Sequence, residues 1–154
     1  MRALWIRLKG EMHVPLRSAF GPELLKPWLP NIVIVEAIGA SPRFRVRLAR
    51  NGGGQLRRPR LTNRFLDEVI LPEQYQTIPA PYLRAMETGE PAEDDILAHQ
   101  FVAPDGTSLS VRRLVMPCSG DGETIDRFVV GLFLYRPESP QLQTSTQALH
   151  RPNC

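Results

Sequence analysis

The six residues from Arg43 to Leu48 alternate strictly between arginine and a large apolar side chain. Successive side chains of an extended chain point to opposite faces. The spacing therefore puts three arginines on one face and three apolar residues on the other, namely Phe44, Val46 and Leu48. This pattern predicts an antiparallel strand with one face in the core and a cationic face in water. The β-branched segment Ile32–Ile38 predicts its partner, joined through a turn at Gly39–Pro42.

Three further strands are predicted in the second half of the chain. Ile96–Val102 and Ser108–Met116 flank Pro104-Asp105-Gly106, whose proline and glycine suit a tight reversal. Ile125–Tyr135 follows a second turn at Ser119–Gly122 and is apolar on both faces, which favours a central position covered on both sides. The longest apolar run, 128–135, has eight residues, whereas a membrane-spanning helix needs roughly 20.

Short helices are predicted around these strands. Residues 2–10 have apolar side chains at helical spacing and stop at Gly10. Further helices are predicted at 22–26, ending before Pro27, at 66–71, and from Pro81 to Gly89, where one face is shared by Tyr82, Leu83 and Met86. The order helix, helix, strand, strand, short helices and three strands predicts an α+β fold. We expect a five-stranded antiparallel sheet with short helices on one face and an N-terminal helix.

Charged residues are distributed unevenly, although the 154 residues carry a formal net charge of only +3. Eight arginines and no acid lie between Arg43 and Arg64, and five acids without a base follow between Glu87 and Asp95. Such blocks can pair with each other, with a second copy or with a partner. We expect pairing within the chain or a dimer, together with plain solvation. Nucleic-acid binding through residues 43–64 is an alternative, although the block lacks the interleaved aromatics on which single-strand binders stack bases.

The chain is expected to form one domain over residues 1–136, followed by a disordered tail over 137–154 that is rich in Pro, Ser, Gln and Thr. No secretory signal is present, and Cys118 and Cys154 make neither a disulfide framework nor a zinc site. The expectation is therefore a cytoplasmic protein without a metal. The acids at 121, 123 and 126 lack the spacing of a calcium loop, which favours a solvated turn.

Several segments, taken in succession, resemble a bacterial subfamily of compact PAS domains. They are Pro27–Asn31, Arg43–Leu48, Leu61–Glu68, Tyr82–Pro91, Arg113–Pro117 and Asp121–Asp126. The resemblance extends over residues 4–136, nearly the whole expected domain. It implies a sensory or regulatory module rather than an enzyme, holding a small ligand or nothing between the sheet and the short helices. Without an attached kinase or cyclase, such a module is expected to act on a partner in trans.

The resemblance also suggests residues for a ligand pocket, although ordinary core packing is the alternative for each of them. They are Leu66, Tyr82, Met86, His99, Phe101, Met116 and Leu132. One segment departs from the subfamily, because residues 49–58 contain three successive glycines where a helix is usual, which predicts a flexible loop. Its arginines are candidate anion-binding residues, namely Arg50, Arg57 and Arg58. No cofactor is predicted: a lone histidine is weak evidence for haem, and Cys118 lacks the motif of flavin-binding PAS domains.

Three functions follow as hypotheses. The leading one is a PAS protein that regulates signalling through protein contacts, with a homodimer as one arrangement and an interface carried by Leu4, Trp5 and Leu8. The second is a sensor of an anionic metabolite, with the arginine–glycine loop closing the pocket. The third is nucleic-acid binding through the arginine block. An enzyme is not expected, because no nucleophile, base and orienting group can be assembled from these residues.

Overall fold

The computed structural model describes residues 1–49, 61–102, 106 and 108–136, with only the backbone described at 97–102 and 108. Three expectations lie outside these residues: the glycine loop at 51–54, the Pro104-Asp105 part of the late turn, and the tail over 137–154.

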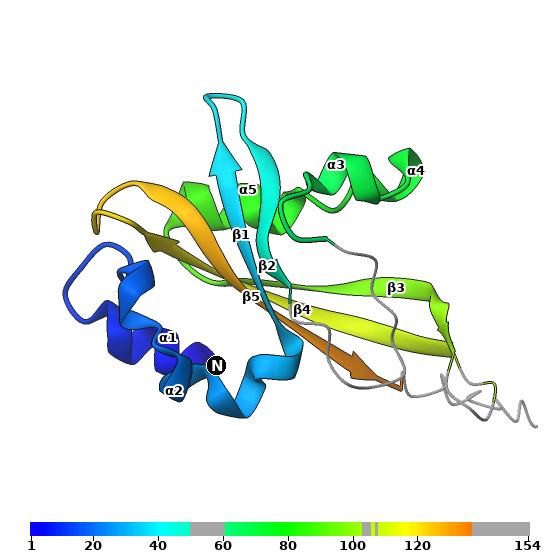
Figure 1. Cartoon of the computed structure of the whole chain (residues 1–154), viewed down its shortest axis with the longest axis horizontal. Coiled ribbons are helices and arrows are strands. Elements are labelled where there is room, and N and C mark those ends of the chain that lie inside the picture. Colours follow the sequence, from blue (N-terminus) through cyan, green and yellow to red (C-terminus); the bar gives the residue numbers. More distant parts are fainter. Residues whose placement is uncertain (50–60, 103–105, 107, 137–154) are drawn as a thin grey trace, which may run out of the picture.

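Five antiparallel strands form one sheet, as the sequence predicts (Figure 1). They are β1 (Ile32–Ile38), β2 (Arg43–Ala49), β3 (Ala92–Val102), β4 (Ser108–Ser119) and β5 (Ile125–Tyr135). Their order across the sheet is β2-β1-β5-β4-β3, so the apolar strand β5 lies at the centre. The chain leaves one edge after β2, passes through helices, and returns at the opposite edge as β3.

The helices are short because prolines and glycines interrupt the chain frequently. Four helical elements precede the sheet: α1 (Arg2–Lys9), a 3-10 turn (Arg17–Ala19), α2 (Pro22–Leu25) and a 3-10 helix (Lys26–Asn31). Three helices lie between β2 and β3: α3 (Leu66–Val69), α4 (Pro72–Tyr75) and α5 (Ala80–Thr88). The α1 and α5 predictions are confirmed, with Gly10 and Gly89 as their C-caps.

The α2 prediction is confirmed to within one residue: the helix ends at Leu25, before Pro27. A separate 3-10 helix then starts at Lys26 and has this proline in its first turn, where a missing N–H costs nothing. The helix prediction after β2 was wrong in detail. The helix expected at 66–71 is only one turn long, because Ile70 returns to extended backbone, and Pro72 then opens α4, which the sequence did not predict.

Helices cover the sheet on both faces and create two cores (Figure 1). The inner core lies between the sheet and α3–α5, and it contains Phe44, Tyr82 and Phe128. The outer core lies under α1, α2 and their connections, and it contains Trp5 and Val129. Since residues 128 and 129 of β5 belong to opposite cores, the central strand is covered on both sides, as its apolar sequence predicts.

The strict alternation of β2 breaks at its end. Val46 pairs with Val35 but Leu48 pairs with Ile34, so Arg47 is an extra residue in the ladder, a β-bulge. One extra residue shifts every later side chain to the other face. Leu48 is therefore 45% exposed rather than buried beside Phe44 and Val46, and the prediction for Leu48 was wrong.

Three acids of the acidic stretch lie in β3, which begins earlier than the strand predicted at Ile96–Val102. β3 begins at Ala92, so Glu93, Asp94 and Asp95 face β4, where Arg113 and Arg112 stand opposite the two aspartates. Oppositely charged cross-strand pairs make these acids compatible with an edge strand. In α5, the prediction that Leu83 shares the buried face was also wrong, because its side chain is 47% exposed.

Candidate functional site

The space in which a PAS domain would hold a ligand is packed with side chains in the described part of the chain. The rings of Phe44 and Tyr82 stack at 4.8 Å between centroids, and Phe128 meets them edge-on at 6.0 and 5.2 Å. Of the predicted pocket residues, four are in this inner core or pack against it: Leu66, Tyr82, Met86 and Leu132. Their contacts are those of core residues.

Met116 does not belong with these four residues. It is fully buried in the outer core, on the opposite side of the sheet, because it pairs with Val129 and shares that residue's face. Its assignment to the pocket was therefore wrong. The side chains of His99 and Phe101 lie outside the described residues, as do the three candidate anion-binding residues of the glycine loop: Arg50, Arg57 and Arg58.

A buried ion pair adjoins the inner core. Arg113 is 2% exposed and donates two hydrogen bonds to Asp94, at 2.8 and 2.6 Å. Its guanidinium lies 5.3 Å from the ring centroid of Tyr82. Burial raises the pKa of the Tyr82 hydroxyl, while the charge of Arg113 opposes that rise. The phenol therefore stays neutral at physiological pH. The three side chains connect β3, β4 and α5 and form a structural contact rather than an acid–base site.

Two of the three side chains of α1 that were expected to form an interface lie in the outer core instead. Leu4 is 7% and Trp5 is 1% exposed, and the indole Nε1 donates a hydrogen bond to the Pro117 carbonyl oxygen at 2.7 Å. Leu8 packs at the edge of the same cluster and is partly buried. The expectation that these side chains form an interface needs correction, because Leu4 and Trp5 are covered by their own chain.

Cys118 lies inside β4, where the outer core buries it. Burial raises the pKa of its thiol to about 12, against the opposing charge of Arg17. A protonated, buried thiol is a poor nucleophile and a poor metal ligand. Cys118 therefore contributes packing.

Among the residues that the structure describes, the two charged blocks do not pair with each other. In the basic block, Arg43 donates two hydrogen bonds to Asp67, both at 2.8 Å, and Arg64 pairs with Glu68 at 3.0 Å. The acidic block pairs with bases from α1 and β4: Lys9–Glu90, Arg2–Glu93, Arg113–Asp94 and Arg112–Asp95. The charged side chains named above therefore form ion pairs within the chain. The other four arginines of the block, at 50, 57, 58 and 60, lie outside the described residues.

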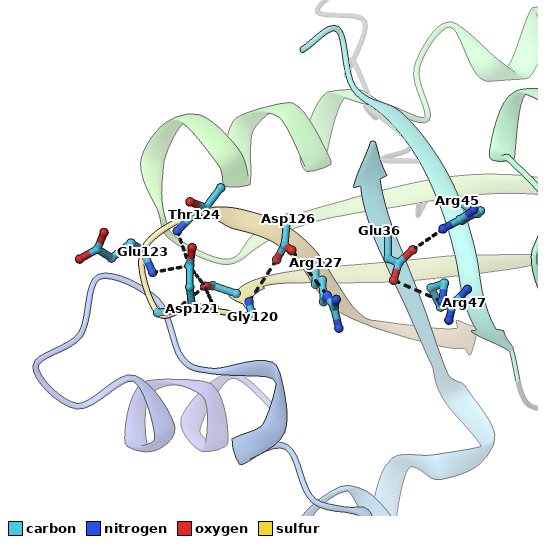
Figure 2. Close-up of polar contacts among 11 residues, drawn as sticks. Glu36, Arg45, Arg47, Gly120, Asp121, Glu123, Thr124, Asp126 and Arg127 are labelled. Carbon is cyan, nitrogen blue, oxygen red and sulfur yellow. Dashed lines mark hydrogen bonds and ion pairs between the residues drawn. The ribbon is translucent and has the colours of Figure 1, made fainter. Parts of the chain in front are cut away.

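The loop between β4 and β5 uses its acids to hold its own backbone (Figure 2). The carboxylate of Asp121 accepts hydrogen bonds from the Ser119 hydroxyl and from the amides of Glu123 and Thr124, at 2.6 to 2.9 Å. The Ser119 hydrogen bond is the first cause of the lowered pKa of Asp121. Among the described residues, no group of three His, Cys, Asp or Glu side chains could hold a metal ion.

A polar region open to solvent lies on the outer face of the sheet, where β2, β1 and β5 are side by side. Arg45, Glu36 and Arg127 stand opposite one another in the pairing of these strands. Glu36 accepts from Arg45 at 3.0 Å through one carboxylate oxygen, and pairs with Arg47 at 3.2 Å through the other (Figure 2). Arg127 pairs instead with its neighbour Asp126, at 3.6 Å.

Two neighbouring hollows open on this surface, and both include Glu36 and Arg127. The first, of about 300 Å³, is also lined by Arg17, Ile34, Arg47 and Leu48; the second, of about 370 Å³, is also lined by Ala37, Ile38, Arg45 and Asp126. We call this region, defined by Arg17, Glu36, Ile38, Arg45, Arg47, Leu48, Asp126 and Arg127, the arginine surface. Sequence reasoning missed Arg17, Glu36 and Arg127, because each lies in a different element and only pairing brings them together.

Within the described residues, no helix is both long and apolar enough to cross a membrane. The comparisons with curated proteins and with solved structures gave no significant match. A family model described as PAS domain matches residues 1–133, which takes in both cores and all five strands up to Phe133. Because that match covers most of the chain and agrees with the observed sheet and helices, the chain belongs to the PAS domain family of sensory and regulatory modules.

Proposed function

We propose that this PAS module acts in trans, through protein contacts made by the arginine surface. The observation that carries the proposal is the composition of that surface. Ile38 and Leu48 are 37% and 45% exposed, and they lie among arginine side chains that are themselves a third to a half exposed. Exposed apolar residues set among arginines are typical of protein interfaces, in which arginine is enriched.

The geometry of the hairpin supports the same proposal. The tip of the β1–β2 hairpin, where β1 ends at Ile38, projects beyond both helical layers, so a partner can approach this end without displacing a helix (Figure 1). Its inner face is occupied by core side chains, of which Phe44 is 1% exposed. Arg45 of the arginine surface and Val46 of the inner core are consecutive residues of β2, so a contact at this surface would be transmitted to the core along the strand.

Nucleic-acid binding receives less support from the same residues. The described arginines of the block are paired with carboxylates, and Arg43 also stacks over the ring of Phe65 at 3.9 Å. Carboxylates in the same network repel phosphate backbones and reduce the counterion release on which such binding depends.

The test is site-specific photocrosslinking in living cells of the organism that makes the protein. A photoreactive amino acid replaces Leu48 or Ile38 in the arginine surface. Leu71 and Leu83, 63% and 47% exposed on the helical side, serve as matched controls. We expect a discrete adduct from positions 48 and 38 and none from 71 and 83. An adduct at twice the mass of the chain identifies a second copy as the partner. Adducts only from the control positions, or from none, contradict the proposal.

A further inference from the structure

The first hollow of the arginine surface has more positive than negative charge. It lies between β1, β2, β5 and the 3-10 turn Arg17–Ala19, and has a volume of about 300 Å³. Three guanidinium groups line it, from Arg17, Arg47 and Arg127, against the single carboxylate of Glu36. The adjoining hollow adds Arg45 and Asp126, so the whole surface keeps two uncompensated positive charges.

Glu36 does not neutralise all of these arginines. Its two oxygens are paired with Arg45 and Arg47, at 3.0 and 3.2 Å, and no ion pair with Arg127 is formed although the two residues are direct neighbours across the strands. The Nε of Arg127 lies 3.6 Å from Asp126 Oδ2, an ion pair beyond hydrogen-bond distance. This nitrogen is buried and has no hydrogen-bond partner among the described residues.

Arg17 also has donors to spare. Among the described residues it makes one hydrogen bond, from Nη1 to the Phe20 carbonyl oxygen at 3.3 Å. Arg17 and Arg127 both line the first hollow, Arg17 from the 3-10 turn and Arg127 from β5. Two arginines with unused donors therefore converge on the same hollow from separate elements.

We propose that this hollow binds an organic phosphate monoester. Such a group carries a charge of about −1.5 to −2 at pH 7, which matches the two surplus positive charges of the surface. Its three acceptor oxygens can accept hydrogen bonds from arginines that reach the hollow from different elements. The planar guanidinium fork matches phosphate geometry. Ile34 and Leu48 form the apolar part of the lining and would contact the organic part of the ester. The proposal goes beyond the contact function, because it needs no protein partner.

The test is isothermal titration calorimetry of the full chain with phenyl phosphate, and with benzoate as a probe of the same ring and a single charge. We expect phenyl phosphate to bind at least tenfold more tightly than benzoate. Arg127→Gln and Arg17→Gln should each weaken phenyl phosphate binding about tenfold, the loss expected for a charge-assisted contact. Arg112→Gln, an exposed arginine paired with Asp95 elsewhere on the sheet, is the control and should leave binding unchanged.

Two further variants test the proposal in other directions. Glu36→Gln removes the carboxylate from the hollow and should tighten phenyl phosphate binding severalfold, a gain that a merely unfolded variant cannot show. Leu48→Ser should weaken phenyl phosphate while leaving inorganic phosphate unaffected. Equal binding of benzoate and phenyl phosphate, or an effect of Arg112→Gln equal to that of Arg127→Gln, would overturn the proposal.

The source of the phosphate is distinguished by a short phosphoserine peptide. Tighter binding of the peptide than of phenyl phosphate identifies a phosphorylated protein as the source, and weaker binding identifies a small metabolite; the hollow is confirmed in either case. The crosslinking experiment needs no phosphate, so adducts at position 48 without phosphate binding would overturn this proposal and leave the contact function standing.

Discussion

Arg113 and Asp94 form a two-pronged ion pair across β4 and β3, with guanidinium nitrogens 2.8 and 2.6 Å from the two carboxylate oxygens. The arginine side chain is 3% exposed and the aspartate side chain is 30% exposed. The pair therefore extends from the buried edge of the inner core to the protein surface. Asp94 compensates the buried positive charge of Arg113. Removing one member of a buried pair leaves the other charge uncompensated, which is destabilising.

Asp94→Asn is therefore expected to lower the free energy of unfolding by about 2 kcal/mol, a value below that for fully buried pairs because water reaches Asp94. The matched control is Asp95→Asn, which breaks the neighbouring exposed pair with Arg112 and should cost less than about 1 kcal/mol. Urea unfolding followed by circular dichroism measures both. Equal losses for the two variants would show that burial of Arg113 does not matter.

Trp5 should be required for stability and not for assembly. Trp5→Phe removes the hydrogen bond to the Pro117 carbonyl and leaves a gap in the outer core, which should cost about 2 kcal/mol or more. Ile6→Ala, at a neighbouring side chain that is 59% exposed, should change stability by about 0.5 kcal/mol or less. Light scattering should give the same oligomeric state for both variants and the wild type. A change of state in Trp5→Phe at unchanged stability would restore Trp5 as an interface residue.

Gly89 has two separate reasons to be glycine. Its φ is +68°, and an added Cβ would lie 2.6 Å from the Cε1 of His13. Gly89 lies in the left-handed region, with ψ 12°, where an alanine costs roughly 1 kcal/mol, and the His13 ring must also turn away from the added Cβ. Gly89→Ala should therefore cost more in the wild type than in a His13→Ala background. Thermal unfolding of the two single variants and the double variant checks this, and equal losses in the two backgrounds would contradict the steric contact.

Cys118 makes stability depend on alkaline pH. Its pKa is about 12 in the folded chain against an ordinary value of 9.0, so the folded state holds its proton where the unfolded state has lost it. The contribution is fully present below pH 9 and is lost as the pH rises toward 12. Unfolding measured between these values should lose stability faster in the wild type than in Cys118→Ala. Parallel curves would show that the thiol titrates normally.

Much of the fold could be predicted from local pattern. The alternation in β2, the β-branched run of β1 and the glycine after α5 each act within a few residues, and each element was found where expected. The central place of β5 also followed, because a strand apolar on both sides needs cover on both sides. Much less of the site could be predicted, since the arginine surface combines β1, β2, β5 and a 3-10 turn.

The sequence by itself determined the order of elements and which side chains are apolar enough to be buried, because both depend on residue type and short-range spacing. Only the tertiary structure decided which face each residue occupies. The bulge at Arg47 turned Leu48 outward, and the pairing of β4 with β5 put Met116 beneath α1 rather than α5. Cross-strand register likewise set Arg127 beside Glu36. Register arises from contacts between residues far apart in the chain, and a shift of one residue reverses every side chain that follows.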